Sequence, residues 1–512
     1  MSNSRTKNTF WNALGGLIVK TSGFFTAFIS RTVFLYVLSM EYAGVSSVFT
    51  NVLTVLSFAE LGIGTAITYA LYKPIAVNDE KQIGKLMNAY KKIYSTIAGV
   101  IFALGLCLIP FLQFIIKDTP DLKEPLWLIY IFYLANTAVS YLLIHKSTFL
   151  VAAQKDHVVS KYKVIISIVK TVVECLLLLI CKSFIVYLLC TIVFTFVQNL
   201  VVAKMAEREY PVLKKKHVGK LDAEEKKKLF NDTRALAMYK VSGTVLNGTD
   251  SILISSIFST VKAGILGNYN LLTNQVYSFV MTLFTATSAS VGNLAATSDK
   301  NHQYGIFNRM MFISFWLYCF CTTSLWTLLN PFMHVWQSSE YVFEWYIVLP
   351  IVIEFYIRGM LSPVTQFRTS NGLFVQGKYR PVIMAVLNIG ISILMAHLVG
   401  IAGIFWGTVI SRALTQLWYD PWLIYKKVFG KKIFGYIKIY AVYGIVTVGC
   451  CALTSGLLNL IVSNEGVLKV LLGGVLCLII PNAVIVLLFF RSKNFKETVG
   501  MAMSLVKGKI KR

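Results

Sequence analysis

Charged residues are scarce in this sequence, and acidic residues are scarcer than basic ones. Asp, Glu, Lys and Arg together make up 14% of the 512 residues, and Asp and Glu number only 23. Hydrophobic residues make up 56%, and the mean hydropathy is +0.66. A soluble chain of this length could not bury so much apolar surface in its cores. This excludes an ordinary soluble protein and predicts that the bilayer is the solvent for most of the chain.

The sequence also lacks the motifs that enzymes and metal sites need. Its six histidines form no His/Glu cluster. It contains no Gly-x-Ser-x-Gly elbow and no glycine-rich phosphate loop followed by Lys-Ser or Lys-Thr. None of its nine cysteines has the Cys-x-x-Cys spacing of a zinc or redox site, so we interpret them as packing residues. We therefore expect no enzyme activity, no bound metal and no cofactor, with Na⁺ or H⁺ as candidate coupling ions.

Basic residues are in excess, with 49 Lys and Arg and a net charge of +26. In a soluble protein this would suggest nucleic acid, but here the basic residues gather in alternate loops between apolar segments, as they do on the cytoplasmic side of membranes. One set of loops holds about 37 of the 49 and the opposite set about five, so we expect both termini to be cytoplasmic and no nucleic-acid partner. The basic set comprises the N-terminus and residues 73–92, 153–163, 204–234, 297–309, 368–380, 425–438 and 491–512.

The longest basic run, residues 204–234, has two interpretations. Its ten Lys and Arg are explained by the cytoplasmic position of the loop alone. A regulatory or lipid-binding role is the alternative.

Apolar segments of membrane-spanning length recur along the whole chain. At roughly 20 residues per span, the sequence predicts about fourteen transmembrane helices. They begin near residues 10, 43, 93, 126, 163, 183, 235, 263, 310, 341, 380, 400, 433 and 465.

A weak internal repeat relates two parts of the chain at a spacing of 220 residues. Ala43 and Gly44 match Ala263 and Gly264, and further matches follow as far as Asn88 and Asn308. Six predicted spans separate the copies, so both copies have the same orientation, as in transporters built from parallel repeats. The predicted fold is all-α and polytopic: a six-helix bundle (1–204), a basic cytoplasmic connector (205–234), a second six-helix bundle (235–425), and two extra helices with a basic cytoplasmic tail (426–512).

Two cytoplasmic loops carry apolar residues at helical spacing. Each is predicted to be an amphipathic helix on the inner membrane surface, with a simple connector as the alternative. The residues are Ile83, Leu86, Met87 and Tyr90 in one loop and Ile306, Phe307 and Met310 in the other.

Ionisable side chains inside spans are the candidate site residues, because each costs about 2.5–3.5 kcal/mol or more at mid-bilayer unless it faces a cavity or a partner. Lys20 and Arg31 lie on one face of the first span, about 16 Å apart. They form either a polar stripe in an interior that accepts anions or two side chains that snorkel to opposite interfaces. Glu60 on the second span is a candidate ion-pair partner of Arg31, with a structural or a functional role.

Span seven carries a polar patch of Asn247, Thr249 and Asp250. For Asp250, three roles stay open: a cation site, a contact to a substrate hydroxyl, and a structural partner for Arg31.

Span ten places Glu354 and Arg358 one turn apart among prolines and a glycine that open a helix. Open backbone inside the membrane is tolerated mainly beside a cavity, while a self-contained ion pair between the two residues is the alternative. Arg412 on span twelve is expected in the cavity or near the inner interface, and Gln366 is a candidate contact for substrate hydroxyls. Lys170 and Glu174 form a similar pair on span five, which we interpret as structural.

The chain resembles the bacterial oligosaccharide flippases of the multidrug/oligosaccharidyl-lipid/polysaccharide (MOP) exporter superfamily over nearly its whole length. The resemblance rests on Arg31 followed by Tyr-Ala-Gly at Tyr42, on AELGIGTAITYAL from Ala59, on Asp250, and on GIAGIFWGTVISR ending at Arg412. Relatives often have Asp at the position of Glu60. The resemblance implies two six-helix bundles around a cationic cavity, in which Arg31 is one of the arginines. Arg358 and Arg412 are assigned to the cavity from their depth in the spans.

The leading hypothesis is a flippase that moves an undecaprenyl-pyrophosphate-linked oligosaccharide across the bacterial cytoplasmic membrane by alternating access, for capsule, exopolysaccharide or O-antigen synthesis. Its partners would be this lipid-linked oligosaccharide, membrane lipids, and a polysaccharide polymerase or assembly proteins. Alternatives are a cation-coupled drug exporter or a peptidoglycan-precursor flippase of the same superfamily, a polymerase or ligase, and a scaffold protein of an assembly complex. The embedded arginines argue against an exporter of cationic drugs, and the short outer loops argue against a polymerase.

Overall fold

The computed structural model describes residues 2–60, 63–118, 120–153, 155–214, 221–225, 227, 233, 248–287, 291–292, 294–295, 298–373 and 376–510. Every regular element in these ranges is a helix, which confirms the predicted all-α fold. The chain divides into two compact units, Met1–Leu271 and Leu272–Arg512. The domain limits predicted from the sequence stay predictions.

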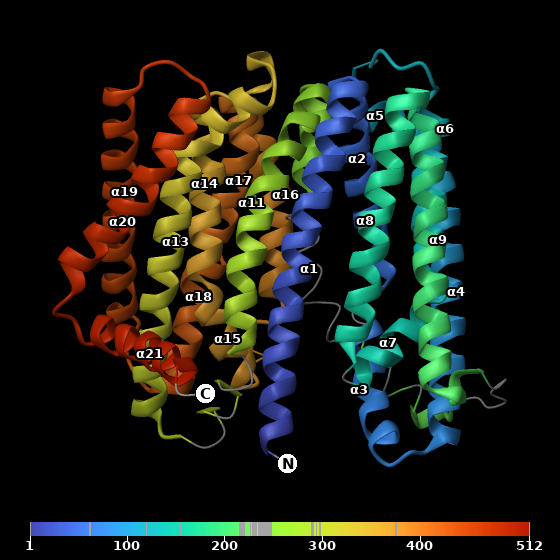
Figure 1. The fold of residues 1–512 in the computed structure, drawn as a ribbon, viewed down its shortest axis with the longest axis horizontal. Helices are drawn as coiled ribbons and strands as arrows, with labels where there is room; N and C mark the ends of the chain where they lie inside the picture. Colours follow the sequence, from blue (N-terminus) through green and yellow to red (C-terminus); the bar gives the residue numbers. More distant parts are fainter. Residues whose placement is uncertain are drawn as a thin grey trace. The chain divides into compact units, whose positions relative to one another are not determined.

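The first unit is built from long helices whose apolar faces pack on one another (Figure 1): α1 lies along α8, α6 along α9, and α4 along α6. Residues 248–257 are also helical in this unit, and the helix that follows them, α11, begins here and ends in the second unit. The elements are α1 (Ser2–Val37), α2 (Met40–Leu56), α3 (Ile63–Ala76), α4 (Glu80–Leu108), α5 (Leu112–Ile115), α6 (Leu126–Tyr141), α7 (Ile144–Ala152), α8 (Asp156–Cys181), α9 (Phe184–Glu209) and α11 (Thr260–Ala286).

The second unit is centred on α13, which packs against α14, α19 and α20. Its last helix, α21, runs across the end of α13 and is held there by an ion pair between Arg309 and Glu497 (Figure 1). The elements are α13 (Lys300–Trp336), α14 (Trp345–Met360), α15 (Ser362–Ser370), α16 (Arg380–Val399), α17 (Ile401–Leu414), α18 (Gln416–Ile424), α19 (Phe434–Ile461), α20 (Val467–Phe489) and α21 (Lys493–Ile510).

The described part of the chain contains nine helices, or ten if the bent pair α6–α7 is one span, that are long and apolar enough to cross a membrane. This confirms a polytopic membrane protein. The other predicted spans fall on helices that are broken or more polar. Span two is α2 and α3 separated by the 3₁₀ turn Ser57–Glu60, span eight is α11, and span twelve is α17 and α18. The start predicted for span seven, near residue 235, lies outside the described residues.

The two predicted surface helices are wrong, because both amphipathic stretches are the first turns of long helices. Asp79 caps α4 by accepting a hydrogen bond from the Gln82 amide at 2.9 Å, and its repeat equivalent Asp299 caps α13 through the Asn301 amide at 3.2 Å. The apolar residues after these caps are buried in protein: Ile83, Leu86, Met87, Tyr90, Phe307 and Met310. An apolar stripe that packs on neighbouring helices has the same period as one that lies on a membrane.

Two glycines of the repeat lie at a close helix crossing in the first unit. A side chain at Gly44 on α2 would overlap the carbonyl group of Thr260, and a Cβ at Gly264 on α11 would lie 2.9 Å from the carbonyl oxygen of Met40. Met40 and Thr260 are also 220 residues apart. The contact of Gly44 with Thr260 therefore has its repeat equivalent in the contact of Gly264 with Met40. Only glycine lets the two backbones approach this closely.

A carboxylate fastens the same crossing. Asp118, in the loop after α5, accepts hydrogen bonds from the Thr260 amide at 2.9 and 3.1 Å and from the Thr260 hydroxyl. It therefore satisfies backbone and side-chain donors at the start of α11.

The described part of the basic connector contacts the start of α4. Glu225 accepts a hydrogen bond from the side-chain amide of Gln82 at 2.6 Å, and Asp222 lies 3.6 Å from the Lys85 ammonium. At the ends of neighbouring helices, a hydrogen bond to Glu209 raises the pKa of Lys155 above its ordinary value. Acidic residues thus offset part of the positive charge of these loops.

Candidate functional site

Arg31 extends from α1 toward α11 within the first unit. Its Nε donates to the Asn268 amide oxygen at 2.5 Å, and its Nη2 donates to the Gly264 carbonyl at 3.3 Å. The guanidinium carbon lies 5.7 Å from the centre of the Phe34 ring. A Cβ at Gly267 would lie 3.3 Å from Nη2, so this glycine leaves room for the arginine. Among the described residues, Arg31 is held by neutral groups and forms no ion pair.

A buried acidic residue of the first unit, Glu174, is already neutralised. It lies 3.5 Å from the Lys170 ammonium and accepts a hydrogen bond from Thr191 at 2.6 Å. The predicted Lys170–Glu174 pair is therefore confirmed. Tyr133 and Tyr187 lie near both Arg31 and Glu174.

Glu60 does not contact Arg31, so the expected ion pair is wrong. Glu60 ends the 3₁₀ turn that interrupts span two, where it accepts a hydrogen bond from the Tyr94 hydroxyl at 3.0 Å. The Tyr94 ring packs on Tyr90 at 4.6 Å between ring centres. The carboxylate is thus held by the Tyr94 phenol of α4, while Arg31 turns toward α11.

Arg358 is the counterpart of Arg31 in the second unit. It donates to the Asn274 amide oxygen at 3.2 Å, and its guanidinium carbon lies 3.7 Å from the centre of the Tyr277 ring. An amide and an aromatic face therefore hold this guanidinium, as they hold Arg31, and it forms no ion pair with a described residue. Helix α11 supplies the amide in both units, from Asn268 in the first and Asn274 in the second.

Glu354 pairs with Arg412 on α17, and not with Arg358 one turn away. Arg412 Nη2 lies 2.5 Å from the Glu354 carboxylate, and Nη1 donates to Gln416 at 2.8 Å. The self-contained pair on span ten is therefore wrong. Arg412 is buried with a matching carboxylate, so its charge is compensated within the unit.

The remaining predicted site residues are dispersed. Lys20 is exposed on α1, and Thr249 and Asp250 are half-buried in the helical residues 248–257. Gln366 donates to the Phe284 carbonyl at 3.2 Å and the Thr287 hydroxyl at 3.0 Å, which ties α15 to the end of α11. Asn247 lies outside the described residues.

Sequence reasoning missed a buried cluster in the second unit. Asp420 on α18 is fully buried and lies 2.7 Å from Arg368 and 3.2 Å from Arg380. It is an acid within an apolar stretch, which is the signal that identified the other candidates. Asn268 and Asn274 were missed because neutral amides on an apolar helix carry little cost that would draw attention to them.

The described residues contain no group of three or more His, Cys, Asp and Glu that could hold a metal ion. Each unit offers one guanidinium group on neutral partners, together with carboxylates that are mostly paired. These groups can bind an anion, and they provide no nucleophile with an adjacent base.

Solved structures of transporters of the MOP superfamily have the same fold as this chain. The lipid II flippase MurJ in an inward closed conformation is similar, with a TM-score of 0.62 and 12% identity over 94% of this chain and 98% of that chain. A mutant form of the Vibrio cholerae MATE transporter VcmN gives a TM-score of 0.59 and 13% identity over 83% of this chain and 97% of that chain.

A MOP superfamily transporter from Pyrococcus furiosus, described as having a binding pocket of reverse polarity, gives a TM-score of 0.53 and 10% identity over 80% of this chain and 92% of that chain. No protein-family model and no curated protein matches the sequence.

Proposed function

We propose that this protein is a flippase for a polyprenyl-pyrophosphate-linked oligosaccharide in the bacterial cytoplasmic membrane, with both termini in the cytoplasm. The observation that carries the proposal is the state of Arg31 and Arg358. Each guanidinium is held by an asparagine and an aromatic ring, with no described acidic partner. A transporter of cationic drugs would not benefit from two such charges inside its units.

Neutral partners make these arginines ready to accept phosphate. A phosphate oxygen carries a full negative charge, and a phosphate can accept two parallel N–H bonds from one guanidinium, which a single neutral amide oxygen cannot match. A pyrophosphate that replaces the Asn268 or Asn274 contact therefore gains energy, whereas one that approaches Arg412 must compete with Glu354. Arg31 and Arg358 are accordingly the proposed pyrophosphate ligands, and Arg412 is a positioning residue for Glu354.

The sugars of the headgroup need hydrogen-bonding groups, because a polar headgroup cannot cross hydrocarbon without them. Thr249, Asp250 and the predicted Asn247 are the proposed contacts. Gln366 is a weaker candidate because it already bonds to α11. Glu60 and Asp250 are the proposed acids for proton or sodium coupling, since Glu354 is engaged by Arg412.

A second candidate cargo is the peptidoglycan precursor. The observation in its favour is the similarity to the lipid II flippase MurJ over 94% of this chain. Both cargos carry a pyrophosphate, so the two arginines suit either one. The two cargos differ in their sugar part, so recognition of the sugars would distinguish them. A polymerase and assembly proteins are proposed partners only if the cargo is the oligosaccharide.

The test uses proteoliposomes that contain the full-length protein and a fluorescent undecaprenyl-pyrophosphate glycan. A membrane-impermeant reductant measures the rate at which the glycan changes leaflets. We expect Arg31→Ala and Arg358→Ala to slow this rate at least ten-fold, because each loses a phosphate ligand worth about 1.5–3 kcal/mol.

Matched controls are Arg208→Ala on α9 and Arg491→Ala after α20, which remove exposed arginines. Both should translocate at the unmodified rate. If Arg31→Ala and Arg358→Ala, folded and inserted, translocate as fast as these controls, the proposed role of the arginines is wrong. Faster movement of lipid II than of the oligosaccharide would favour the second cargo.

A further inference from the structure

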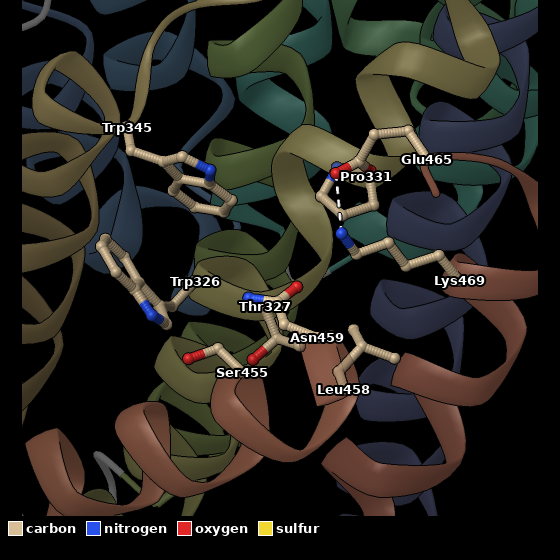
Figure 2. Close-up of a pocket in the computed structure, with 9 residues that line it drawn as sticks. All are labelled: Trp326, Thr327, Pro331, Trp345, Ser455, Leu458, Asn459, Glu465 and Lys469. Carbon is tan, nitrogen blue, oxygen red and sulfur yellow. Dashed lines mark hydrogen bonds and ion pairs between the residues drawn. The ribbon is translucent and has the colours of Figure 1, made fainter. Parts of the chain in front are cut away.

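The second unit contains a pocket where α13 and α19 end and α14 and α20 begin (Figure 2). Arg358 lies near the other end of α14. The pocket has a volume of about 220 Å³ and is partly open. The charge pattern of the loops predicts that these helix ends face the outer side of the membrane. The lining residues are Trp326, Thr327, Pro331, Trp345, Ser455, Leu458, Asn459, Glu465 and Lys469.

Two indole rings form one wall of the pocket. Trp326 on α13 and Trp345 on α14 have ring centres 4.9 Å apart and planes tilted by 51°, and both rings lie on the same side in Figure 2. The tilt leaves ring face available to a ligand, which a stacked pair would cover. Neither indole N–H donates to another described residue, although the indole of Trp316 on the same helix bonds to Asn482 at 2.8 Å.

Polar groups line the rest of the pocket. Thr327 is one of the lining residues, and its hydroxyl is buried beside the Cys477 thiol. Ser455 donates to the Cys451 carbonyl at 2.7 Å, which leaves its oxygen free to accept. Asn459 adds an amide at the rim. Ser455 and Asn459 can therefore bond to hydroxyl groups of a ligand that enters the pocket.

Charge decides which ligand fits. Lys469 has a side chain only 8% exposed and lies 2.7 Å from Glu465, as Figure 2 shows. The pocket therefore has no net charge, which disfavours an anion. A zwitterionic headgroup would have to separate this ion pair before it could bind, whereas hydroxyl groups can bond to both partners and leave the pair intact.

Tryptophan is common at membrane interfaces, and anchoring alone would account for Trp345 at its exposed position. It would not account for the buried Lys469 and Thr327 beside the rings. Apolar rings opposite hydroxyl, amide and ion-pair groups suit a sugar, which has an apolar C–H face and polar edges. The volume lies below the roughly 300–1,000 Å³ of pockets for drug-sized ligands and suits one sugar ring.

We propose that this pocket binds one hexose-sized unit of a neutral saccharide on the outer side of the membrane. Trp326 and Trp345 hold its C–H face, while Ser455, Asn459 and the Glu465–Lys469 pair bond to its hydroxyls. The site stands apart from the arginines and does not depend on the proposed translocation.

The experiment measures binding of defined sugars to the full-length protein in phosphatidylglycerol nanodiscs by saturation-transfer NMR. The probes are glucose, galactose, N-acetylglucosamine and maltotriose, with glucose 6-phosphate as the charged comparison. At least one neutral probe should bind, glucose 6-phosphate should bind more weakly, and Trp345→Ala and Asn459→Ala should each weaken binding at least ten-fold. Trp418→Ala, which removes an exposed tryptophan of α18, is the matched control and should bind normally.

Three results would overturn the proposal: no binding of any neutral probe, binding that survives both pocket substitutions, or preferred binding of the charged sugar. Nanodiscs of phosphatidylethanolamine provide a further arm, because displacement of the sugar by this lipid would assign the pocket to a zwitterionic headgroup instead. Translocation by Trp345→Ala is measured in parallel. A normal rate with lost sugar binding shows that the pocket and the translocation site are separate.

Discussion

At the scale of single residues, the partners of the embedded charges sort them into two groups. Glu174, Glu354 and Asp420 contact basic side chains, while Arg31 and Arg358 contact amides and aromatic rings. A buried charge with an ionic partner is chiefly structural, and its removal leaves the partner uncompensated. The first group should therefore control stability and the second group binding.

The cluster around Asp420 gives the first test of this division. Asp420→Ala removes the carboxylate that both Arg368 and Arg380 contact. Because one buried partner is lost while the cations stay, we expect the free energy of unfolding to fall by about 3–5 kcal/mol. Denaturation of the purified protein in detergent measures it. Asp121→Ala in an exposed loop is the control, and equal stability of the two variants would contradict the structural role.

The Glu354–Arg412 pair gives a second test. In a double-mutant cycle with Glu354→Gln and Arg412→Gln, we expect a coupling energy of about 0.5–3 kcal/mol, because the two side chains contact each other directly. The cycle Glu354→Gln with Arg358→Gln is the comparison and should give a value near zero. The reverse order of the two coupling energies would restore the Glu354–Arg358 pair, which the sequence analysis gives as the alternative.

Residue identity and depth were sufficient to select Arg31, Arg358, Glu354 and Arg412, but not to assign their partners. Spacing along one helix favours Glu354 with Arg358, since residues four apart are neighbours. The structure instead pairs Glu354 with a residue 58 positions later. Such a choice depends on how α14 and α17 pack, which no local pattern encodes.

At the scale of helices, several starts predicted from the sequence agree closely with the structure. The predicted starts near 126, 183, 380, 400 and 433 agree with α6, α9, α16, α17 and α19 within a residue. The starts near 93 and 310 are wrong, because α4 begins at Glu80 and α13 at Lys300, thirteen and ten residues earlier. A helix that leaves the membrane without a break keeps its period while its outer face becomes polar, so hydropathy alone misses its first turns.

The crossing of α2 and α11 permits a prediction at the same scale. Glycine in a helix costs about 1 kcal/mol relative to alanine, so Gly→Ala in an open position should be neutral or stabilising. Gly44→Ala should instead lower the free energy of unfolding by about 1–3 kcal/mol, because its methyl group meets the backbone of Thr260. Gly99→Ala on α4, where the space is open, is the matched control. A stabilised Gly44→Ala variant would show that the two helices do not cross this closely.

At the scale of the whole molecule, the duplication explains why equivalent residues have equivalent tasks. Asp79 and Asp299 cap α4 and α13, and Gly44 and Gly264 meet at one crossing. A transporter with parallel repeats works by opening one face of the membrane while the other is closed. On the proposed function, we predict that the crossing of α2 and α11 in the first unit, fastened by Asp118, separates during each cycle.

A reversible cross-link tests whether the crossing separates. In Asp118→Cys/Thr260→Cys, the new thiols replace side chains that are in hydrogen-bond contact, so oxidation should join them. We expect the oxidised double variant to translocate the fluorescent glycan at least ten-fold more slowly, and a reductant to restore the rate. Each single variant under oxidant is the control for the native cysteines, all of which are free thiols. A fully cross-linked protein that translocates as fast as the reduced protein would show that this crossing stays intact throughout the cycle, and alternating access would then need a different movement.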